Sequence, residues 1–204
     1  MYSRVSLNIS SFIIIVGVDL TLNFCTASIL FLFSCITEPH GCGLGFTDIS
    51  GKCYNENDIA VLQAFIDSSS ATISTTWDID NSGLVDPIEL STQKWNESGR
   101  LTLLWLYDDT LKDEIPDNIG NLRYLDTLNL AYNQITGEIP ESIGNLENLD
   151  YLYLYSNQLN GNIPISICNI FSKASHFWIQ YNALCPPYPD CIPESDIHPQ
   201  NTSQ

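Results

Sequence analysis

Residues 122–145 and 146–169 are two consecutive copies of one 24-residue pattern, and this repeat constrains the fold more than any other feature. Apolar residues, asparagines, glycines and prolines recur at matching positions in the two copies: Leu122/Leu146, Leu125/Leu149, Leu128/Leu152, Leu130/Leu154, Asn133/Asn157, Ile135/Leu159, Gly137/Gly161, Ile139/Ile163 and Pro140/Pro164. A fixed period of this length indicates stacked units, because one unit cannot bury its own apolar face. We therefore expect a solenoid.

The spacing inside each copy predicts one strand followed by a turn. Leu128 and Leu130 are two residues apart, so in a strand both side chains point to the same face, toward the core. Asn133 follows at the turn, where its amide can satisfy backbone groups of the loop and of the next coil. Gly137 comes where we expect a backbone conformation that is costly for a residue with a Cβ.

Two degenerate copies flank the regular pair. In residues 98–121 the apolar frame persists, but Asp109 replaces the asparagine and Asp113 replaces the glycine. The last copy starts near Ile170 and slips by one residue. Terminal repeats are expected to be atypical because they close the core. The sequence therefore predicts about four coils between residues 98 and 193.

The repeat, with its G-x-I-P-x-x-I-G-N segment, resembles the leucine-rich repeat superfamily and its plant-type subclass over residues 101–184. The resemblance implies an α/β solenoid: a short horseshoe with a parallel sheet on the concave face, where family members bind ligands. A helix, then Trp95, then Gly99-Arg100-Leu101 resemble the small helical cap that precedes such repeats. No kinase motif follows the repeats, so we do not expect a complete receptor kinase.

We divide the chain into four parts. Residues 1–36 are an export signal or membrane anchor, and residues 37–97 are an N-terminal cap with an amphipathic helix and an EF-hand-like loop. Residues 98–193 carry the repeats and a C-terminal cap. Residues 194–204 are polar, and we expect them to be disordered.

The N-terminal segment indicates export. Arg4 precedes two apolar runs, residues 12–18 and 29–33, which is typical of a segment read by the secretion machinery. Three interpretations remain open: a cleaved signal peptide, an uncleaved anchor, and a lipoprotein signal in which Cys35 is lipidated. All three place the protein outside the cell or on the outer face of its envelope or plasma membrane. Contact with the membrane is expected only through this segment.

Seven cysteines also suit an oxidising compartment. Beyond the leader, Cys42 with Cys53 would close a short loop, and Cys185 with Cys191 would staple the C-terminal end. Cys168 is left free or competes for a partner in the C-terminal cap. Connectivity does not follow from the sequence alone.

Two local motifs lie ahead of the repeats. Asn55, with Asp58 three residues later, predicts a capping box that starts a helix over residues 56–67. Residues 78–89 then follow the spacing of a calcium-binding EF-hand loop, with Gly83 at the sharp turn. The candidate ligands are Asp78, Asp80, Ser82, Leu84, Asp86 and Glu89. An Asp-rich surface turn explains the same residues equally well, and calcium is the only cofactor we consider.

The outward positions of the strands predict a binding surface. They form four rows, one for each strand, and aromatic residues align across the rows, as in the column Trp105–Asn129–Tyr153–Trp178. Tyrosine and tryptophan combine large apolar area with a hydrogen-bonding tip, which is typical of interfaces. The candidate partner-binding residues are Trp105, Tyr107, Asn129, Tyr132, Tyr151, Tyr153, Tyr155, His176, Trp178 and Tyr181. Aromatic residues also suit strands in general, so a purely structural role is the alternative.

The expected function rests on the outward aromatic residues and on the net charge of the chain. With 24 acids, 7 bases and a net charge of −17, the chain is a poor match for nucleic acid. We expect a recognition module for a protein, peptide or glycan. The alternatives are a structural or adhesion module of the cell surface and a carboxylate-based hydrolase. We do not expect an enzyme, because the sequence has no catalytic motif for nucleophilic, zinc or phosphoryl chemistry.

Overall fold

The structure is a computed structural model of the 204-residue chain, and it describes residues 4–9, 12–17, 42–69, 78 and 85–201. The chain divides into two compact units, Met1–Pro39 and His40–Gln204. In the first unit β1 (Arg4–Ile9) pairs antiparallel with β2 (Phe12–Gly17). Among the described residues, no helix has the length and apolar character needed to span a bilayer. Cys35 lies outside the described residues, and the export segment stays a prediction.

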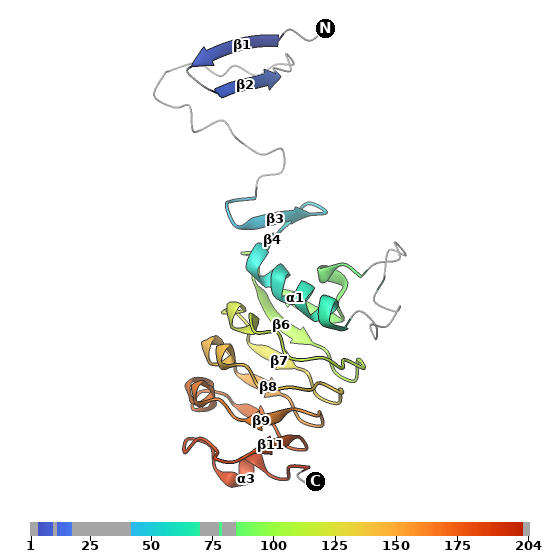
Figure 1. Cartoon of the computed structure of the whole chain (residues 1–204), viewed down its shortest axis with the longest axis vertical. Helices are drawn as coiled ribbons and strands as arrows, with labels where there is room; N and C mark the ends of the chain where they lie inside the picture. Colours follow the sequence, from blue (N-terminus) through green and yellow to red (C-terminus); the bar gives the residue numbers. More distant parts are fainter. Residues whose placement is uncertain (1–3, 10–11, 18–41, 70–77, 79–84, 202–204) are drawn as a thin grey trace. The chain divides into compact units, whose positions relative to one another are not determined.

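A five-stranded sheet organises the second unit, in the order β10-β8-β7-β6-β5 (Figure 1). The strands are β5 (Thr92–Trp95), β6 (Leu101–Trp105), β7 (Thr127–Asn129), β8 (Tyr151–Tyr153) and β10 (His176–Trp178). The last four run parallel, as predicted, and β5 adds an antiparallel strand that the sequence pattern did not reveal. Leu128 pairs with Leu152, and Leu152 pairs with Phe177, which confirms the one-residue slip in the last coil.

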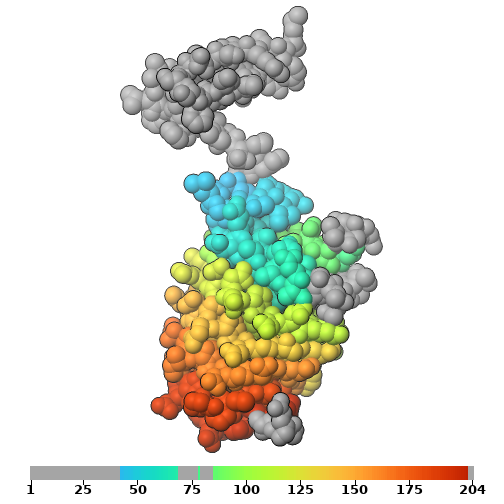
Figure 2. Space-filling model, in the orientation of Figure 1, coloured from blue at the N-terminus to red at the C-terminus, as the bar shows by residue number. Residues whose placement is uncertain are grey.

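Each strand returns through a short helical turn on the other side of the coil. These turns are η3 (Ile119–Asn121), η4 (Glu141–Asn145), η5 (Ile165–Ile167) and α2 (Cys168–Phe171), and they stack on one another. Beside them β9 (Asn160–Asn162) pairs parallel with β11 (Ala183–Cys185). The leucines and isoleucines of the repeat form one continuous core between the two sides. Figure 2 shows the coils as successive bands of colour along this unit.

Gly137 confirms the prediction made for its position. Its φ is +74°, in the left-handed region, and a Cβ there would lie 2.6 Å from Cγ of Glu114 in the preceding coil. Glycine is therefore needed both for the backbone conformation and for the close approach of two coils.

Buried asparagines lock each coil to the preceding one. The Asn133 amide nitrogen donates to the carbonyl oxygens of Leu106 at 2.6 Å and Leu130 at 2.9 Å, and its Oδ1 accepts from the N–H of Leu111 at 3.0 Å. Asn157 and Asn182 repeat this bridge one and two coils later. The prediction that the amide serves the loop is confirmed, but the bridge runs to the preceding coil and not to the next.

Asp109 holds the equivalent position in the first coil. Its carboxylate accepts a 2.8 Å hydrogen bond from Ser91 Oγ, and burial raises its pKa above the usual range for an aspartate. An aspartate cannot donate as the asparagines do. Here the hydrogen-bond donor comes from Ser91, which precedes β5.

We expect Asn133→Ala to lower the free energy of unfolding by about 3 kcal/mol or more, because it leaves several buried backbone groups without partners. Thermal and denaturant unfolding measure the change. Gln134→Ala is the matched control, since Gln134 is exposed and next to Asn133. Equal stability of the two variants would contradict a locking role for the amide.

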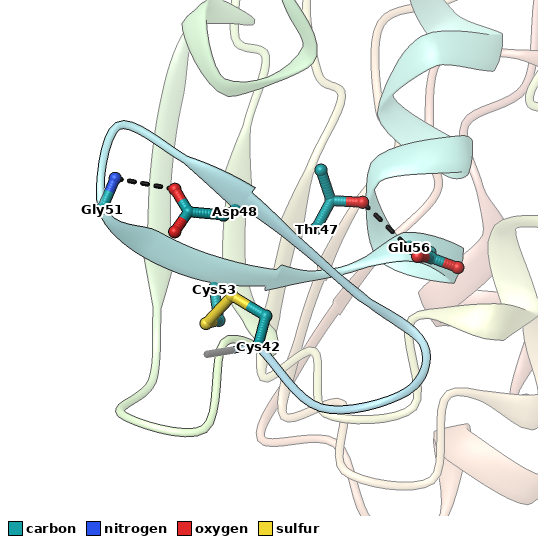
Figure 3. Close-up of a disulfide and its surroundings, with 6 residues drawn as sticks. All are labelled: Cys42, Thr47, Asp48, Gly51, Cys53 and Glu56. Carbon is teal, nitrogen blue, oxygen red and sulfur yellow. Dashed lines mark hydrogen bonds between the residues drawn. A yellow bond between two sulfur atoms is a disulfide. The ribbon is translucent and has the colours of Figure 1, made fainter. Parts of the chain in front are cut away.

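The N-terminal cap contains a hairpin and a helix. Strands β3 (Phe46–Ile49) and β4 (Lys52–Asn55) pair antiparallel, a hairpin that the sequence pattern did not reveal. The predicted Cys42–Cys53 disulfide ties the chain ahead of β3 to β4 (Figure 3). Asp48 Oδ1 accepts from the N–H of Gly51 at 2.8 Å and closes the turn. Residue spacing predicted the disulfide, but not the hairpin or the Asp48–Gly51 hydrogen bond.

Helix α1 (Glu56–Ser69) begins at the predicted Asn55, whose Oδ1 accepts from the N–H groups of Asn57 and Asp58. Only half of the predicted capping box forms: the Asp58 N–H bonds to Asn55 Oδ1, but the Asp58 carboxylate is fully buried and faces the first coil. It accepts two hydrogen bonds from the Arg100 guanidinium, at 2.8 and 2.9 Å, and one from the N–H of Leu101 at 2.8 Å. This ion pair fixes the helix against the start of β6.

The C-terminal cap differs from the prediction in two ways. The disulfide joins Cys168 to Cys191, and Cys185 is an exposed free thiol, so the predicted Cys185–Cys191 pair is wrong. The reason is orientation: Cys185 ends β11 with its side chain exposed, whereas Cys168 lies in α2, within disulfide reach of Cys191. The bond therefore ties α2 to the segment that precedes residue 194.

The predicted disordered tail is also wrong over residues 194–201. Helix α3 (Glu194–Ile197) buries Ile197, and the segment after it bonds to the last coil. The N–H of Tyr181 donates to Pro199 O at 2.6 Å, and Gln200 Nε2 donates to Ile179 O at 3.2 Å. The tail thus makes hydrogen bonds with the last coil that a further coil would otherwise make.

We expect Cys191→Ser to lower the free energy of unfolding by roughly 3 kcal/mol, because the bond closes a loop of 23 residues. Cys185→Ser should leave the melting temperature unchanged, since that thiol is exposed and unpaired. Non-reducing peptide mapping checks the connectivity. A Cys185–Cys191 peptide in the map would contradict the structure.

Candidate functional site

The outward positions of the sheet carry the candidate site, and strand register puts them in line. Trp105 pairs with Asn129, Asn129 with Tyr153, and Tyr153 with Trp178, which confirms the predicted column. A second column, across three strands, aligns Thr127, Tyr151 and His176. We call the exposed and half-buried rings of this surface the aromatic face: Trp105, Tyr107, Tyr132, Tyr151, Tyr153, Tyr155, His176, Trp178 and Tyr181.

Eight of these rings form one connected network. From Tyr107 the contacts run to Tyr132 (5.3 Å between centroids), Tyr155 (5.2 Å) and Trp178 (5.7 Å). From Trp178 they continue to Tyr153 at 5.2 Å and on to Trp105 at 6.3 Å. Tyr151 and His176 stack at 4.9 Å and join through Tyr153. Most neighbouring rings meet edge to face, which is a favourable arrangement for aromatic pairs.

The rings cover the small polar residues between them. Asn129 is only 3% exposed, and its Oδ1 accepts from the N–H of Ala131 at 3.0 Å. Asn129 therefore lies beneath the aromatic face and supports it. The sequence pattern placed it correctly on the outward side but could not reveal that the Trp105 and Tyr153 rings meet across it.

Backbone conformation fixes the rings at the carboxyl ends of the strands. Tyr132 and Tyr181 have φ values of +57° and +56°, in the left-handed region that non-glycine residues rarely occupy. Each N–H bonds across the stack, Tyr132 to Tyr155 O and Tyr181 to Pro199 O. Both side chains are 50% exposed.

Acidic residues lie at the amino ends of the middle strands. Asp150 Oδ1 accepts from the N–H of Ser175 at 2.9 Å, and the hydrogen bonds with Ser175 hold the pKa of Asp150 below its usual range. Burial, the neighbouring Tyr151 and the charge of Asp150 raise the pKa of Tyr153, and burial raises that of Tyr155. These hydroxyls stay protonated at neutral pH and can donate. The sequence shows the 24-residue spacing from Asp126 to Asp150. It does not show that Asp150 lies near the Tyr153 and His176 rings, because that depends on how the strands stack.

The predicted calcium ligands are only partly described. Asp80, Ser82 and Leu84 lie outside the described residues, and Asp78 lies between undescribed segments. Asp86 precedes the short turn η2 (Pro87–Glu89), and its N–H donates to Glu89 Oε2 at 3.1 Å. Glu89 therefore also serves the turn itself. No group of three potential metal ligands occurs among the described residues, and calcium binding stays a prediction.

A groove of about 940 Å³ offers a second concave surface, away from the aromatic face. Glu114, Glu138 and Glu141 line it above Ile139, with Pro187, Tyr188 and Pro189 at the C-terminal end. The Tyr188 hydroxyl is already bonded to Leu184 O at 3.2 Å. Tyr188 is the one aromatic residue among the described residues that line the groove. The groove therefore lacks a cluster of rings like that of the aromatic face.

The model of the family described as "Leucine rich repeat" matches residues 100–159, which hold β6, the first regular coil and the strand and turn of the second. The chain belongs to the leucine-rich repeat superfamily. Its G-x-I-P segments are those of the plant-type subclass. No curated protein matches the sequence.

Three solved structures are similar to part of this chain. A plant ice-binding protein is 29% identical, with a TM-score of 0.52, over 64% of this chain and 42% of its own length. The PEPR1–AtPEP1 structure is 23% identical, with a TM-score of 0.50, over 71% of this chain and 24% of that one. The Arabidopsis receptor kinase HAESA, solved with the peptide hormone IDA and the co-receptor SERK1, is 40% identical with a TM-score of 0.40, over 42% of this chain and 14% of its own. This chain thus spans less than half the length of each.

Proposed function

We propose that this leucine-rich repeat protein is an exported recognition module, a short horseshoe of about four coils behind a helical cap, that binds a protein or peptide on its aromatic face. The network of eight rings across four parallel strands carries this proposal. Trp105, Tyr107 and Trp178 are 40%, 41% and 46% exposed, so a contiguous aromatic surface faces water. Such surfaces on soluble proteins mark interaction sites.

Ring orientation favours a peptide over a glycan. Neighbouring rings are crossed at 64° between Tyr153 and Trp178 and at 80° between Tyr132 and Tyr155. A glycan stacks on continuous flat ring faces, whereas crossed rings leave ridges and slots that side chains of an extended peptide can fill. Tyrosine and tryptophan anchors of this kind dominate the binding energy of protein interfaces.

The compartment fits this role. The Cys42–Cys53 and Cys168–Cys191 disulfides persist in oxidising surroundings, as outside the cell. With the predicted export segment they support a module that meets its partner there, with the membrane contacted only through the N-terminal residues. We propose binding without catalysis.

Screening a displayed library of random dodecapeptides tests this function. Wild-type protein should enrich peptides that quench tryptophan fluorescence, and Tyr153→Ala or Trp178→Ala should weaken their binding at least about tenfold, the usual loss at an interface anchor. Melting temperatures should change little, because both rings are partly exposed. Ile165→Ala is the control, since Ile165 is 67% exposed and lines the groove away from the rings. Enrichment of no peptide, or equal binding by all variants, would overturn the proposal.

A further inference from the structure

One corner of the aromatic face combines rings with carboxylates. Tyr151, Tyr153 and His176 lie with ring centroids 4.9 to 6.4 Å apart, and Trp178 is 5.2 Å from Tyr153. Asp150 directly precedes Tyr151 at the start of β8. The corner thus holds Asp150 next to Tyr151, and the charge of Asp150 acts on both Tyr153 and His176.

A second carboxylate lies on the adjacent strand. The N–H groups of Asp150 and Tyr151 both donate to the Asp126 carbonyl oxygen, at 2.9 and 3.0 Å, so the two aspartates start neighbouring parallel strands. The Asp126 carboxylate also accepts from Thr127 Oγ1 at 2.8 Å. Asp126 and Asp150 therefore lie at the same edge of the sheet.

No described lysine or arginine forms an ion pair with Asp126 or Asp150. The one ion pair between described residues is Arg100 with Asp58. Lys173 lies two residues before Ser175 but makes no ion pair with Asp150. Lys94 points to the same side of the sheet, opposite Leu103, but it lies on β5, with β6 and β7 between it and β8.

The same chemistry already holds a cation inside this protein. The Arg100 guanidinium lies 4.5 Å from the centroid of the Tyr124 ring while it bonds to the Asp58 carboxylate. A ring face attracts a cation through its quadrupole, and a carboxylate adds a charge-assisted hydrogen bond. At the corner both partners are present, and no described lysine or arginine forms an ion pair with them.

We propose that the corner formed by Asp126, Asp150, Tyr151, Tyr153 and His176 binds an arginine or lysine side chain of the peptide partner. This inference rests on the proposed function and names the chemistry of its ligand: an extended basic peptide, with apolar side chains in the slots near Tyr107 and Tyr132. The net charge of −17 attracts such a partner at long range.

Titration by NMR with Nα-acetyl-arginine amide tests the corner directly, and its neutral isostere Nα-acetyl-citrulline amide is the matched probe. Arginine should shift the backbone amide signals of residues 150–153 and 175–178 with at least about fivefold tighter binding than citrulline, from the ring and carboxylate contacts together. Asp150→Asn should remove this preference while it keeps an acceptor for the N–H of Ser175. Asp113→Asn, with the same charge change at an exposed turn residue, should preserve it.

The outcomes separate the inference from the function it rests on. Equal binding of arginine and citrulline, or an unchanged preference in Asp150→Asn, overturns the cation site, even where library peptides bind the aromatic face. Arginine binding at the corner without enrichment of any library peptide supports the cation site and overturns the peptide-binding function.

Discussion

The buried asparagine bridge between coils is the interaction on which the rest of this structure depends. Each amide donates to carbonyl oxygens of its own coil and of the preceding one, and thereby fixes the position of one strand against the next. A slip of one residue would move the leucines out of the core and the aromatic rings into it. Asn133, Asn157 and Asn182 therefore determine the core and the exposed surface together.

The aromatic face is a consequence of that alignment. Strand register holds Tyr153 directly opposite Trp178 and, with Asn129 between them, in line with Trp105. The Tyr153 ring therefore contacts both tryptophan rings. The rings in turn bury Asn129 and Ala131, so the surface is backed by packed side chains and not by solvent. A preorganised surface of this kind loses less conformational entropy when it binds a partner.

The 24-residue period was sufficient to predict the parallel sheet, its register and the outward rows, because period and strand geometry are local properties of the sequence. The period could not predict contacts between residues that are far apart in the sequence. The Asp58–Arg100 pair spans 42 residues, and nothing in the spacing of Asp58 distinguishes it from a capping residue. The pairing of Cys168 with Cys191, and the order of residues 194–201, depend on where the last coil ends in space. Polar composition suggested disorder for a tail whose Ile197 is buried.

The central claim is that coil stacking presents the rings as one preformed surface, and nuclear Overhauser effects between ring protons of the ligand-free protein test it most directly. The structure predicts cross-strand effects for Tyr132 with Tyr155 and for Tyr153 with Trp178, whose centroids are each 5.2 Å apart. They should be present before any peptide is added. Independently mobile rings, without cross-strand effects in a folded protein, would contradict the account.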